Sequence, residues 1–309
     1  MIHANTIRSG LIACAGKMLG GPPVLVYVRD CLPESPQARL AIRYIGRFSN
    51  LVVANSRFTA DAFGKTRAGE TVVEYPPVGP PLGATEDAPA LRSSLGIPAK
   101  AFTLGVVGQI TPWKGQDLAI RALSQLRAQG IDAWLAIVGS VKFVGPGRTH
   151  DNRAYRESLT ELVARLEVED RVIFAGERSD VGTALSMLDL LLMPSWEEPF
   201  GRILVEAAHV GTPMIATSMG GSAEVIDDDR TGYLEPPKAP DRWAARIAPS
   251  SGIVPNSAVV HARVRTAPIP LPHMAAPPMP KHLRTTTLTI GVVHCPITWA
   301  TRRPRRSVP

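Results

Sequence analysis

Cysteine is scarce in this sequence, and the cysteines present form none of the common cysteine motifs. Cys14, Cys31 and Cys295 include no C-x-x-C pair and have no histidine at the spacing of a metal ligand. The seven histidines show no metal spacing either. In a chain of 309 residues, three scattered thiols favour a reducing compartment and argue against a disulfide framework.

Long apolar runs are also absent. No run approaches the roughly 20 apolar residues that cross a bilayer. After Arg8, only residues 11–15 form an apolar core, which is too short for a signal peptide. We therefore expect a cytoplasmic protein and leave open a peripheral contact with the cytoplasmic face of the membrane. Neither a Ser/His/Asp order nor a G-x-S-x-G elbow is visible in the sequence.

Acidic residues are missing from the C-terminal end of the chain. Ten of the 34 Lys and Arg residues, but none of the 27 Asp and Glu residues, lie in residues 242–309. The residues before them carry 24 basic and 27 acidic side chains, a net charge of −3. Because a nucleic-acid-binding protein normally carries its basic residues on the folded domain, we expect no nucleic-acid partner. Residues 249–309 also hold eleven prolines, and we predict an irregular, disordered, basic and proline-rich tail over 237–309.

The rest of the sequence has an α/β pattern in two parts. In residues 1–81, apolar runs predict buried strands at 24–28, 51–54 and 71–75, with helices at 36–48 and up to Phe63. Residues 1–5 resemble the end of one more strand. We interpret this part as a partial α/β domain that is truncated at its N-terminus. A Pro- and Gly-rich interdomain linker is predicted at 82–101.

Residues 102–236 show the strongest α/β pattern. Strands are predicted at 102–107, 133–138, 171–174, 188–193 and 213–217, and amphipathic helices separate them. This alternation predicts a doubly wound parallel sheet. Ligands of such sheets bind at the loops that follow the carboxyl ends of the strands.

Two glutamates in such a loop, Glu198 and Glu206, are eight residues apart. We expect a helix to begin near Pro199, and helical geometry then separates them by roughly 12 Å along the axis and roughly 80° around it. Carboxylates that share one glycosidic bond lie about 5–9.5 Å apart. The spacing better suits two separated points on a long ligand, although two solvated carboxylates without a function remain an alternative on spacing alone.

Two more loops suit a phosphate group. Residues 108–115 follow a predicted strand and open a helix, and Lys114 adds a cation. Their glycines match neither the dinucleotide fingerprint nor the P-loop, which argues against a nucleotide-dependent dehydrogenase. Gly220 and Gly221 precede another predicted helix, where successive amides suit an anion. Three such loops at one edge of a sheet predict a phosphate-bearing ligand.

Together these residues resemble the retaining glycosyltransferases of the GT-B architecture, in the large family usually numbered four. The resemblance covers residues 102–236 and rests on four blocks in the same order and spacing. These blocks are residues 108–115, 166–176 and 198–206, and Gly220–Gly221 to Glu224 with Thr231–Gly232. The resemblance implies two Rossmann-like domains, with a nucleoside-diphosphate-sugar held by the C-terminal one. Residues 1–81 would then be a partial Rossmann-like domain on the acceptor side. The resemblance further implies transfer of a hexose-type sugar, with retention, to an unidentified glycan, lipid or small-molecule acceptor.

The resemblance also implies roles for single residues. Glu198 would contact the donor sugar near its reacting carbon, Lys114 would neutralise the departing pyrophosphate, and Glu206 would bond the ribose hydroxyls. Besides these three, it implies the following donor-binding residues: Gly108, Gln109, Phe200, Gly201, Gly220 and Gly221. No metal and no cofactor is implied.

The sequence departs from the family pattern in several places. Gln109 stands where the family often has arginine, which removes one phosphate-binding cation. Arg29 and Asp30 lie about where many relatives carry a histidine. The opening strand with its glycine-rich loop, and the helix that returns to brace the first domain, have no counterpart. An alternative hypothesis is therefore a truncated, inactive relative that at most binds a nucleotide-sugar.

Overall fold

The structure is a computed structural model that describes residues 1–248, except for 33–34, 68, 84, 143 and 146–150. All of the described residues belong to one compact unit. The predicted disorder at 249–309 lies outside the described residues. The predicted division into an N-terminal domain, a linker and a donor-binding domain stays a prediction.

The first sheet is parallel and has the strand order β1-β2-β3-β6. Its strands are β1 (Ile2–Ala4), β2 (Val24–Val28), β3 (Leu51–Ala54) and β6 (Val72–Val73). The helices that connect them are α1 (Ile7–Met18), α2 (Pro36–Phe48) and α3 (Arg57–Phe63), and a small hairpin, β4 (Lys65–Thr66) with β5 (Gly69–Glu70), follows α3. The predicted strand at 71–75 is shorter than expected, because only two of its residues pair with β3.

Local capping explains where the helices of this part begin. Thr6 and Ser9 form a reciprocal capping box at the start of α1, a helix that the apolar pattern of the sequence did not predict. Ser35 caps α2, whose first residue is proline. Ser56 caps α3. Apolar side chains from β2, α1 and α2 then form a core in which Val26 and Ile45 are fully buried.

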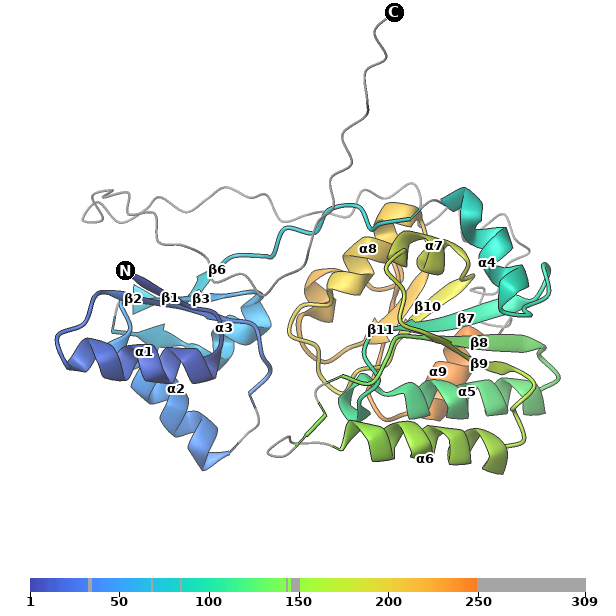
Figure 1. Cartoon of the computed structure of the whole chain (residues 1–309), viewed down its shortest axis with the longest axis horizontal. Helices are drawn as coiled ribbons and strands as arrows, with labels where there is room; N and C mark the ends of the chain where they lie inside the picture. Colours follow the sequence, from blue (N-terminus) through green and yellow to red (C-terminus); the bar gives the residue numbers. More distant parts are fainter. Residues whose placement is uncertain (33–34, 68, 84, 143, 146–150, 249–309) are drawn as a thin grey trace, which may run out of the picture. The chain divides into compact units, whose positions relative to one another are not determined.

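The second sheet is larger, also parallel, and has the order β12-β11-β10-β7-β8-β9. Its strands are β7 (Phe102–Val107), β8 (Ala133–Val138), β9 (Val172–Gly176), β10 (Leu190–Met193), β11 (Met214–Thr217) and β12 (Tyr233–Glu235). One face is covered by α5 (Gln116–Ala128), α6 (Asn152–Arg165) and α9 (Pro240–Ile247). The other face is covered by α4 (Ala88–Ser94), α7 (Val181–Ser186) and α8 (Arg202–Val210) (Figure 1). Short 3-10 turns, η1 (Thr85–Asp87), η2 (Pro112–Lys114) and η3 (Gly221–Glu224), complete the elements.

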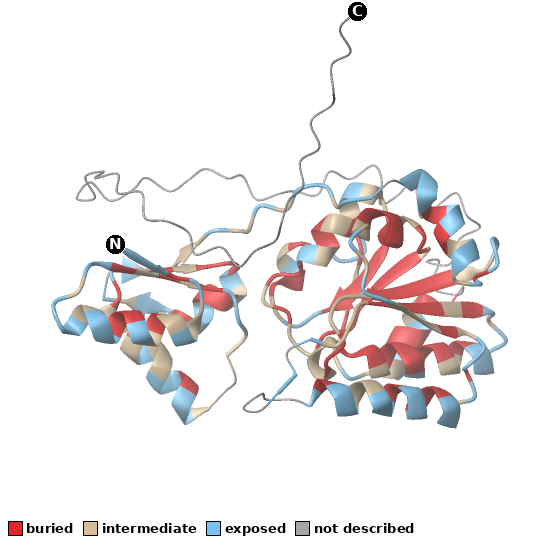
Figure 2. Cartoon of the chain, viewed as in Figure 1, coloured by how far each residue is buried: buried red, intermediate tan, exposed pale blue. Residues whose placement is uncertain are grey.

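The central strands of the second sheet are buried on both faces (Figure 2). Every residue of β10 and β11 is buried, as expected for a parallel sheet between two helical layers. This explains why the strands could be predicted from continuous apolar runs. The doubly wound sheet confirms the predicted fold class.

Helix α9 differs from the predicted irregular tail. Residues 240–247 are helical, and Trp243 is fully buried with its indole N–H donating to the Pro236 carbonyl at 2.8 Å. Helix α9 packs against α5 and closes the core beside it. The high proline and arginine content of the following residues obscured this amphipathic helix in the sequence.

Candidate functional site

The second sheet reverses its direction of growth beside β7. Strands β8 and β9 lie on one side of β7, and β10, β11 and β12 lie on the other. The carboxyl ends of β7 and β10 therefore flank a topological switch point, where open α/β sheets bind their ligands. Residues 108–115 follow β7, and residues 194–201 follow β10. Two of the three predicted loops thus begin at this switch point, and the third follows the neighbouring strand β11.

The loops after β7 and β10 are in direct backbone contact. Gly115 has a φ of +70°, and a Cβ atom there would lie 2.1 Å from the Pro194 carbonyl oxygen. The Trp196 amide donates to the Trp113 carbonyl at 2.8 Å. Only glycine combines this left-handed conformation with this close approach. The two loops therefore form one packed unit.

This packing brings together Lys114 and Glu198, which are 84 residues apart in the chain. The Lys114 ammonium donates to Glu198 Oε2 at 2.6 Å, and the two side chains are only 18% and 10% exposed. The hydroxyl of Ser195, a fully buried residue, donates to the same oxygen at 3.2 Å. No partner of Glu198 Oε1 occurs among the described residues. The two predicted catalytic residues therefore form a largely buried ion pair.

The two loops also carry tryptophans whose rings contact lysine side chains. The Lys114 ammonium lies 4.2 Å from the centroid of the Trp113 ring, and the Lys238 ammonium lies 4.1 Å from the centroid of the Trp196 ring. A cation over an aromatic face is attracted by the ring quadrupole. Trp113 therefore limits the positions open to the Lys114 side chain and helps to hold it beside Glu198.

The paired glycines of the third loop pack on the backbone of Glu198. Gly220 forms a parallel β-bridge with Glu198, and the Gly221 amide donates to the Glu198 carbonyl at 2.7 Å. A Cβ atom at Gly220 would lie 2.1 Å from that carbonyl oxygen. The sequence predicted that the Gly221 amide binds phosphate, but in the structure this amide donates to the Glu198 carbonyl. The glycines permit close packing of two loops.

Helix α8 begins later than the sequence predicted. Its first residue is Arg202, with Gly201 at the N-cap in a left-handed conformation (φ +90°). Glu198 is held in an extended β-bridge instead, so the expected helix start near Pro199 is wrong. The helical estimate of the distance between Glu198 and Glu206 therefore does not apply. Gly201 lies at the amino end of a helix, where backbone amides suit an anion.

Glu206 lies in the second turn of α8. Its side chain is 19% exposed and forms an ion pair with Arg202 at 3.6 Å. Burial raises the pKa of Glu206, while Arg202 and His209 oppose that rise in pKa. A half-buried carboxylate with one exposed ion-pair partner can accept hydrogen bonds from ligand hydroxyl groups.

The remaining predicted donor-binding residues have mixed surroundings. Phe200 is buried in the core, and its ring lies 5.8 Å from that of Tyr75. The Gly108 amide is already engaged with the Val138 carbonyl at 2.9 Å. Gln109 accepts a hydrogen bond at its carbonyl from the Gln116 side chain at 2.8 Å. Phe200 and Gly108 are therefore held by the scaffold, and only their remaining backbone atoms can contact a ligand.

Sequence reasoning did not single out three polar residues at this site. Ser195 bonds Glu198, as described above. Gln116 and Ser222 are fully buried, and Gln116 Oε1 and Ser222 Oγ have no hydrogen-bond partner within the described part of the chain. Buried polar atoms without partners are rare. The position of Ser195, three residues before Glu198, and that of Ser222, directly after the paired glycines, could have drawn attention to both.

Charges of this site also act on Cys31, which lies in the loop after β2. Burial raises the pKa of the Cys31 thiol, and the carboxylates of Glu197 and Glu198 raise that pKa further. The thiol therefore stays protonated near neutral pH. The same loop contains Arg29 and Asp30, whose role the sequence left unassigned.

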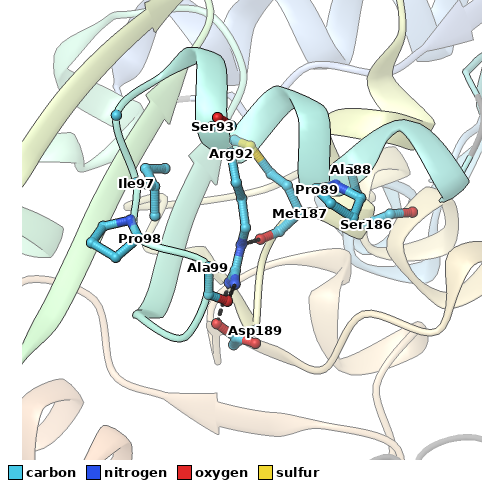
Figure 3. A pocket seen from close by; sticks show the side chains of 11 residues that line it. Ala88, Pro89, Arg92, Ser93, Ile97, Pro98, Ala99, Ser186, Met187 and Asp189 are labelled. Carbon is cyan, nitrogen blue, oxygen red and sulfur yellow. Dashed lines mark hydrogen bonds and ion pairs between the residues drawn. The ribbon is translucent and has the colours of Figure 1, made fainter.

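A cavity of about 540 Å³ lies at the opposite end of the strands from this site (Figure 3). Residues 97–99 and 186–189, which precede β7 and β10, line it together with α4. Arg92 donates to the Met187 carbonyl at 2.7 Å and to Asp189 at 2.5 Å. Asp189 also accepts from the Thr103 amide at 2.8 Å. Arg92 thereby anchors α4 to the sheet and is not free to bind a ligand.

Among the residues that the structure describes, no group of three or more His, Cys, Asp or Glu residues is placed to hold a metal ion. None of the helices in this described part is long and apolar enough to cross a membrane. The metal-independent chemistry implied by the family resemblance stays a prediction.

Comparison with solved structures agrees with this architecture. The chain is similar to Anabaena Alr3699/HepE in complex with UDP and glucose, with 30% identity, a TM-score of 0.73, and coverage of 85% of this chain and 71% of that chain. The same protein in complex with UDP-glucose gives a TM-score of 0.72 at 29% identity, and covers 85% of this chain and 72% of that chain. The fold is therefore of the GT-B type.

Comparison with curated sequences leads to the same group of proteins. The chain is 30% identical over 283 residues to the D-inositol 3-phosphate glycosyltransferase of Salinispora arenicola. That alignment covers 82% of this chain and 62% of the relative, so the chain spans less than two thirds of the relative's length. The family model described as "Glycosyl transferases group 1" matches residues 87–249, which is more than half of the chain. The chain therefore belongs to the group 1 glycosyl transferase family.

Proposed function

We propose that this chain binds a nucleoside-diphosphate-sugar at the switch point of its larger sheet and transfers the sugar to an acceptor with retention. The buried Lys114–Glu198 ion pair is the observation that carries this proposal. It combines a cation for a leaving phosphate with a carboxylate beside the reacting sugar, between two loops that follow adjacent strands. The assignment to family four and to hexosyl transfer is part of the same proposal.

The chemistry of Lys114 allows it to serve two partners. An ammonium group has three N–H donors, and one of them is engaged with Glu198 Oε2. A diphosphate oxygen can accept another without breaking the ion pair. Negative charge develops on the diphosphate as the bond to the sugar breaks, and a fixed cation in a poorly hydrated site stabilises that charge strongly. Lys114 is therefore proposed to stabilise the departing nucleoside diphosphate.

Glu198 is proposed to contact the donor sugar through Oε1. Its Oε2 is held by Lys114 and Ser195, which fixes the orientation of the carboxylate. Glu206 is proposed to accept hydrogen bonds from the ribose hydroxyls. Gly201 and the start of α8 are proposed to lie near the diphosphate, and Gln109 near its outer oxygens. Gly108, Phe200, Gly220 and Gly221 would then shape this donor site mainly through their backbone.

Uridine is the proposed base of the donor. This proposal is supported by the similarity to a protein whose structures contain UDP and UDP-glucose. An inositol phosphate is the first acceptor to test, because the curated relative is named an inositol 3-phosphate glycosyltransferase. No cofactor is proposed.

A calorimetric titration paired with a turnover assay tests this function. We expect UDP and UDP-glucose to bind with one site per chain, and GDP-mannose to bind more weakly. In the turnover assay, NMR of the released or transferred sugar should show the donor's anomeric configuration. Binding without release or transfer of sugar would support the alternative of an inactive nucleotide-sugar binder. Absence of UDP binding would contradict both hypotheses.

A further inference from the structure

Glu224 forms a set of hydrogen bonds that the proposed chemistry does not use. Its carboxylate accepts from the Arg57 amide at 2.8 Å and from the Phe58 amide at 2.9 Å. The Tyr75 hydroxyl also donates to it, at 2.8 Å. Arg57 and Phe58 are the first two residues of α3, so three bonds join one carboxylate to residues 149 to 167 positions earlier in the chain.

These bonds complete the amino end of α3. The first amides of a helix have no carbonyl partner within the helix. The Ser56 hydroxyl accepts a hydrogen bond from the Thr59 amide at 3.0 Å, as an N-cap side chain does. Glu224 accepts hydrogen bonds from the Arg57 and Phe58 amides, which Ser56 does not engage. Its negative charge is favourable at the positive end of the helix dipole. A short helix of one part of the chain is thus capped by a carboxylate from another part.

Tyr75 strengthens the same connection. Its ring packs beside the Phe200 ring, with the centroids 5.8 Å apart, and it contacts the core under α8. Burial, and to a smaller extent the hydrogen bond to Glu224, raise the pKa of Tyr75 to about 12. The hydroxyl therefore remains a donor at neutral pH, and Tyr75 touches both the loop after β10 and the loop after β11.

The other end of this connection is the backbone of Glu198. Glu224 is the last residue of η3, and Gly221 is its first. The Gly221 amide donates to the Glu198 carbonyl at 2.7 Å, and Gly220 forms a β-bridge with Glu198. A single four-residue turn thus links the capped end of α3 to the residue proposed to contact the donor sugar.

We propose that Glu224 is a positioning residue, which anchors the turn carrying Gly220 and Gly221 to α3 and to Tyr75 and so fixes the backbone of Glu198. Its effect on donor binding rests on the proposed function, whereas the anchoring itself does not. Loss of the carboxylate frees the turn at one end. Glu198 then samples positions in which Oε1 is misplaced for the donor sugar.

The test compares Glu224→Ala and Glu224→Gln with Glu161→Ala, which removes an exposed glutamate from α6. Hydrogen exchange at Arg57 and Phe58 reports the hydrogen bonds, and titration with UDP-glucose reports the donor site. We expect faster exchange at both amides and about tenfold weaker UDP-glucose binding in Glu224→Ala. Glu224→Gln, which keeps one acceptor oxygen, should lie between Glu224→Ala and the unchanged protein. Glu161→Ala should match the unchanged protein in both measurements.

A second variant covers the case in which Glu224→Ala folds poorly. Tyr75→Phe removes one hydrogen bond but keeps the ring that packs on Phe200, and it should weaken UDP-glucose binding by a few-fold. Unchanged affinity and unchanged exchange in the Glu224 variants would overturn the proposal. If exchange rises at Arg57 and Phe58 while UDP-glucose affinity stays constant, the anchoring exists but the positioning role is overturned. If the unchanged protein does not bind UDP-glucose, the proposed function and the positioning role both fail, whereas faster exchange at Arg57 and Phe58 in Glu224→Ala would still support the anchoring.

Discussion

At the scale of single residues, the ion pair between Lys114 and Glu198 joins two residues that are proposed to act on the donor. Sequence reasoning found both side chains but assigned them to different parts of the donor. It could not predict their ion pair, because their contact depends on the approach of two loops 84 residues apart. It also missed Ser195, whose hydroxyl is buried against the same carboxylate oxygen. Residue type and spacing identify candidates, but they do not reveal a contact between distant loops.

A double-mutant cycle tests this coupling. Lys114→Met leaves the buried Glu198 carboxylate without its cation, and we expect a loss of about 1–3 kcal/mol in the free energy of unfolding. Glu198→Gln removes the charge that needs the cation. The loss of unfolding free energy in the double variant should therefore be smaller, by about 0.5–3 kcal/mol, than the sum of the losses in the two single variants. Urea denaturation of the four proteins measures this energy, and additive effects would show that the ion pair contributes nothing to stability.

Glu206 offers a separate test through pH. Its folded pKa is raised above the ordinary 4.5 by burial. The negatively charged form, which accepts hydrogen bonds from hydroxyl groups at both oxygens, is therefore lost at a higher pH than for an exposed glutamate. We expect UDP affinity to fall as the pH is lowered from about 7.5 to about 5.

Glu206→Gln provides the control for this pH dependence. At neutral pH it should weaken UDP binding by about 1–3 kcal/mol, and its affinity should change less between the two pH values. A variant with the same pH profile as the unchanged protein would assign the titration to another group, such as a phosphate of the ligand.

At the scale of helices and strands, prediction succeeded where burial dominates and failed where backbone geometry decides. The strands β7, β8 and β10 appear in the sequence as continuous apolar runs because helices cover both faces of the sheet. Helix α8 was placed too early, because Pro199 suits a first helical turn. The left-handed Gly201 and the β-bridge at Glu198 exclude that start. Neither constraint is visible without the partner loop.

The close approach of the loops after β7 and β10 can be tested with two glycines at similar backbone angles. Gly115 (φ +70°) would place a Cβ atom 2.1 Å from the Pro194 carbonyl oxygen, whereas Gly130 (φ +78°) has nothing within 4 Å. Gly130→Ala should cost about 1–2 kcal/mol of stability, because it places a side chain in the left-handed region. Gly115→Ala should cost more, by about 1–3 kcal/mol, since the loops must also separate.

Thermal denaturation and UDP titration distinguish the two glycine variants. Gly130→Ala should retain the UDP affinity of the unchanged protein, because the C-terminal end of α5 lies away from the switch point. Gly115→Ala should lose affinity in addition to stability. Equal stability of the two variants would contradict the packed arrangement of the loops.

At the scale of the whole molecule, the order of the strands determines where the site residues lie. The order β12-β11-β10-β7-β8-β9 puts the carboxyl ends of β7 and β10 side by side, and most of the predicted site residues follow these two strands, while Gly220 and Gly221 follow β11. The cavity lined by Arg92 lies at the opposite end of the same strands, and its arginine is engaged in hydrogen bonds to backbone carbonyls. The parallel fold could be predicted from the alternation of strands and helices. The α9 helix and the capping of α3 by Glu224 could not, because both depend on contacts between distant segments.

Hydrogen exchange of the unchanged protein with and without UDP-glucose tests most directly where the donor binds. Protection is expected in residues 108–116, at the loop after β7, and in residues 196–206, at the loop after β10 and the start of α8. Residues 88–99, beside the cavity lined by Arg92, should exchange at the same rate in both conditions. Protection confined to residues 88–99, or absent from both loops at a saturating concentration of UDP-glucose, would contradict a donor site at the switch point.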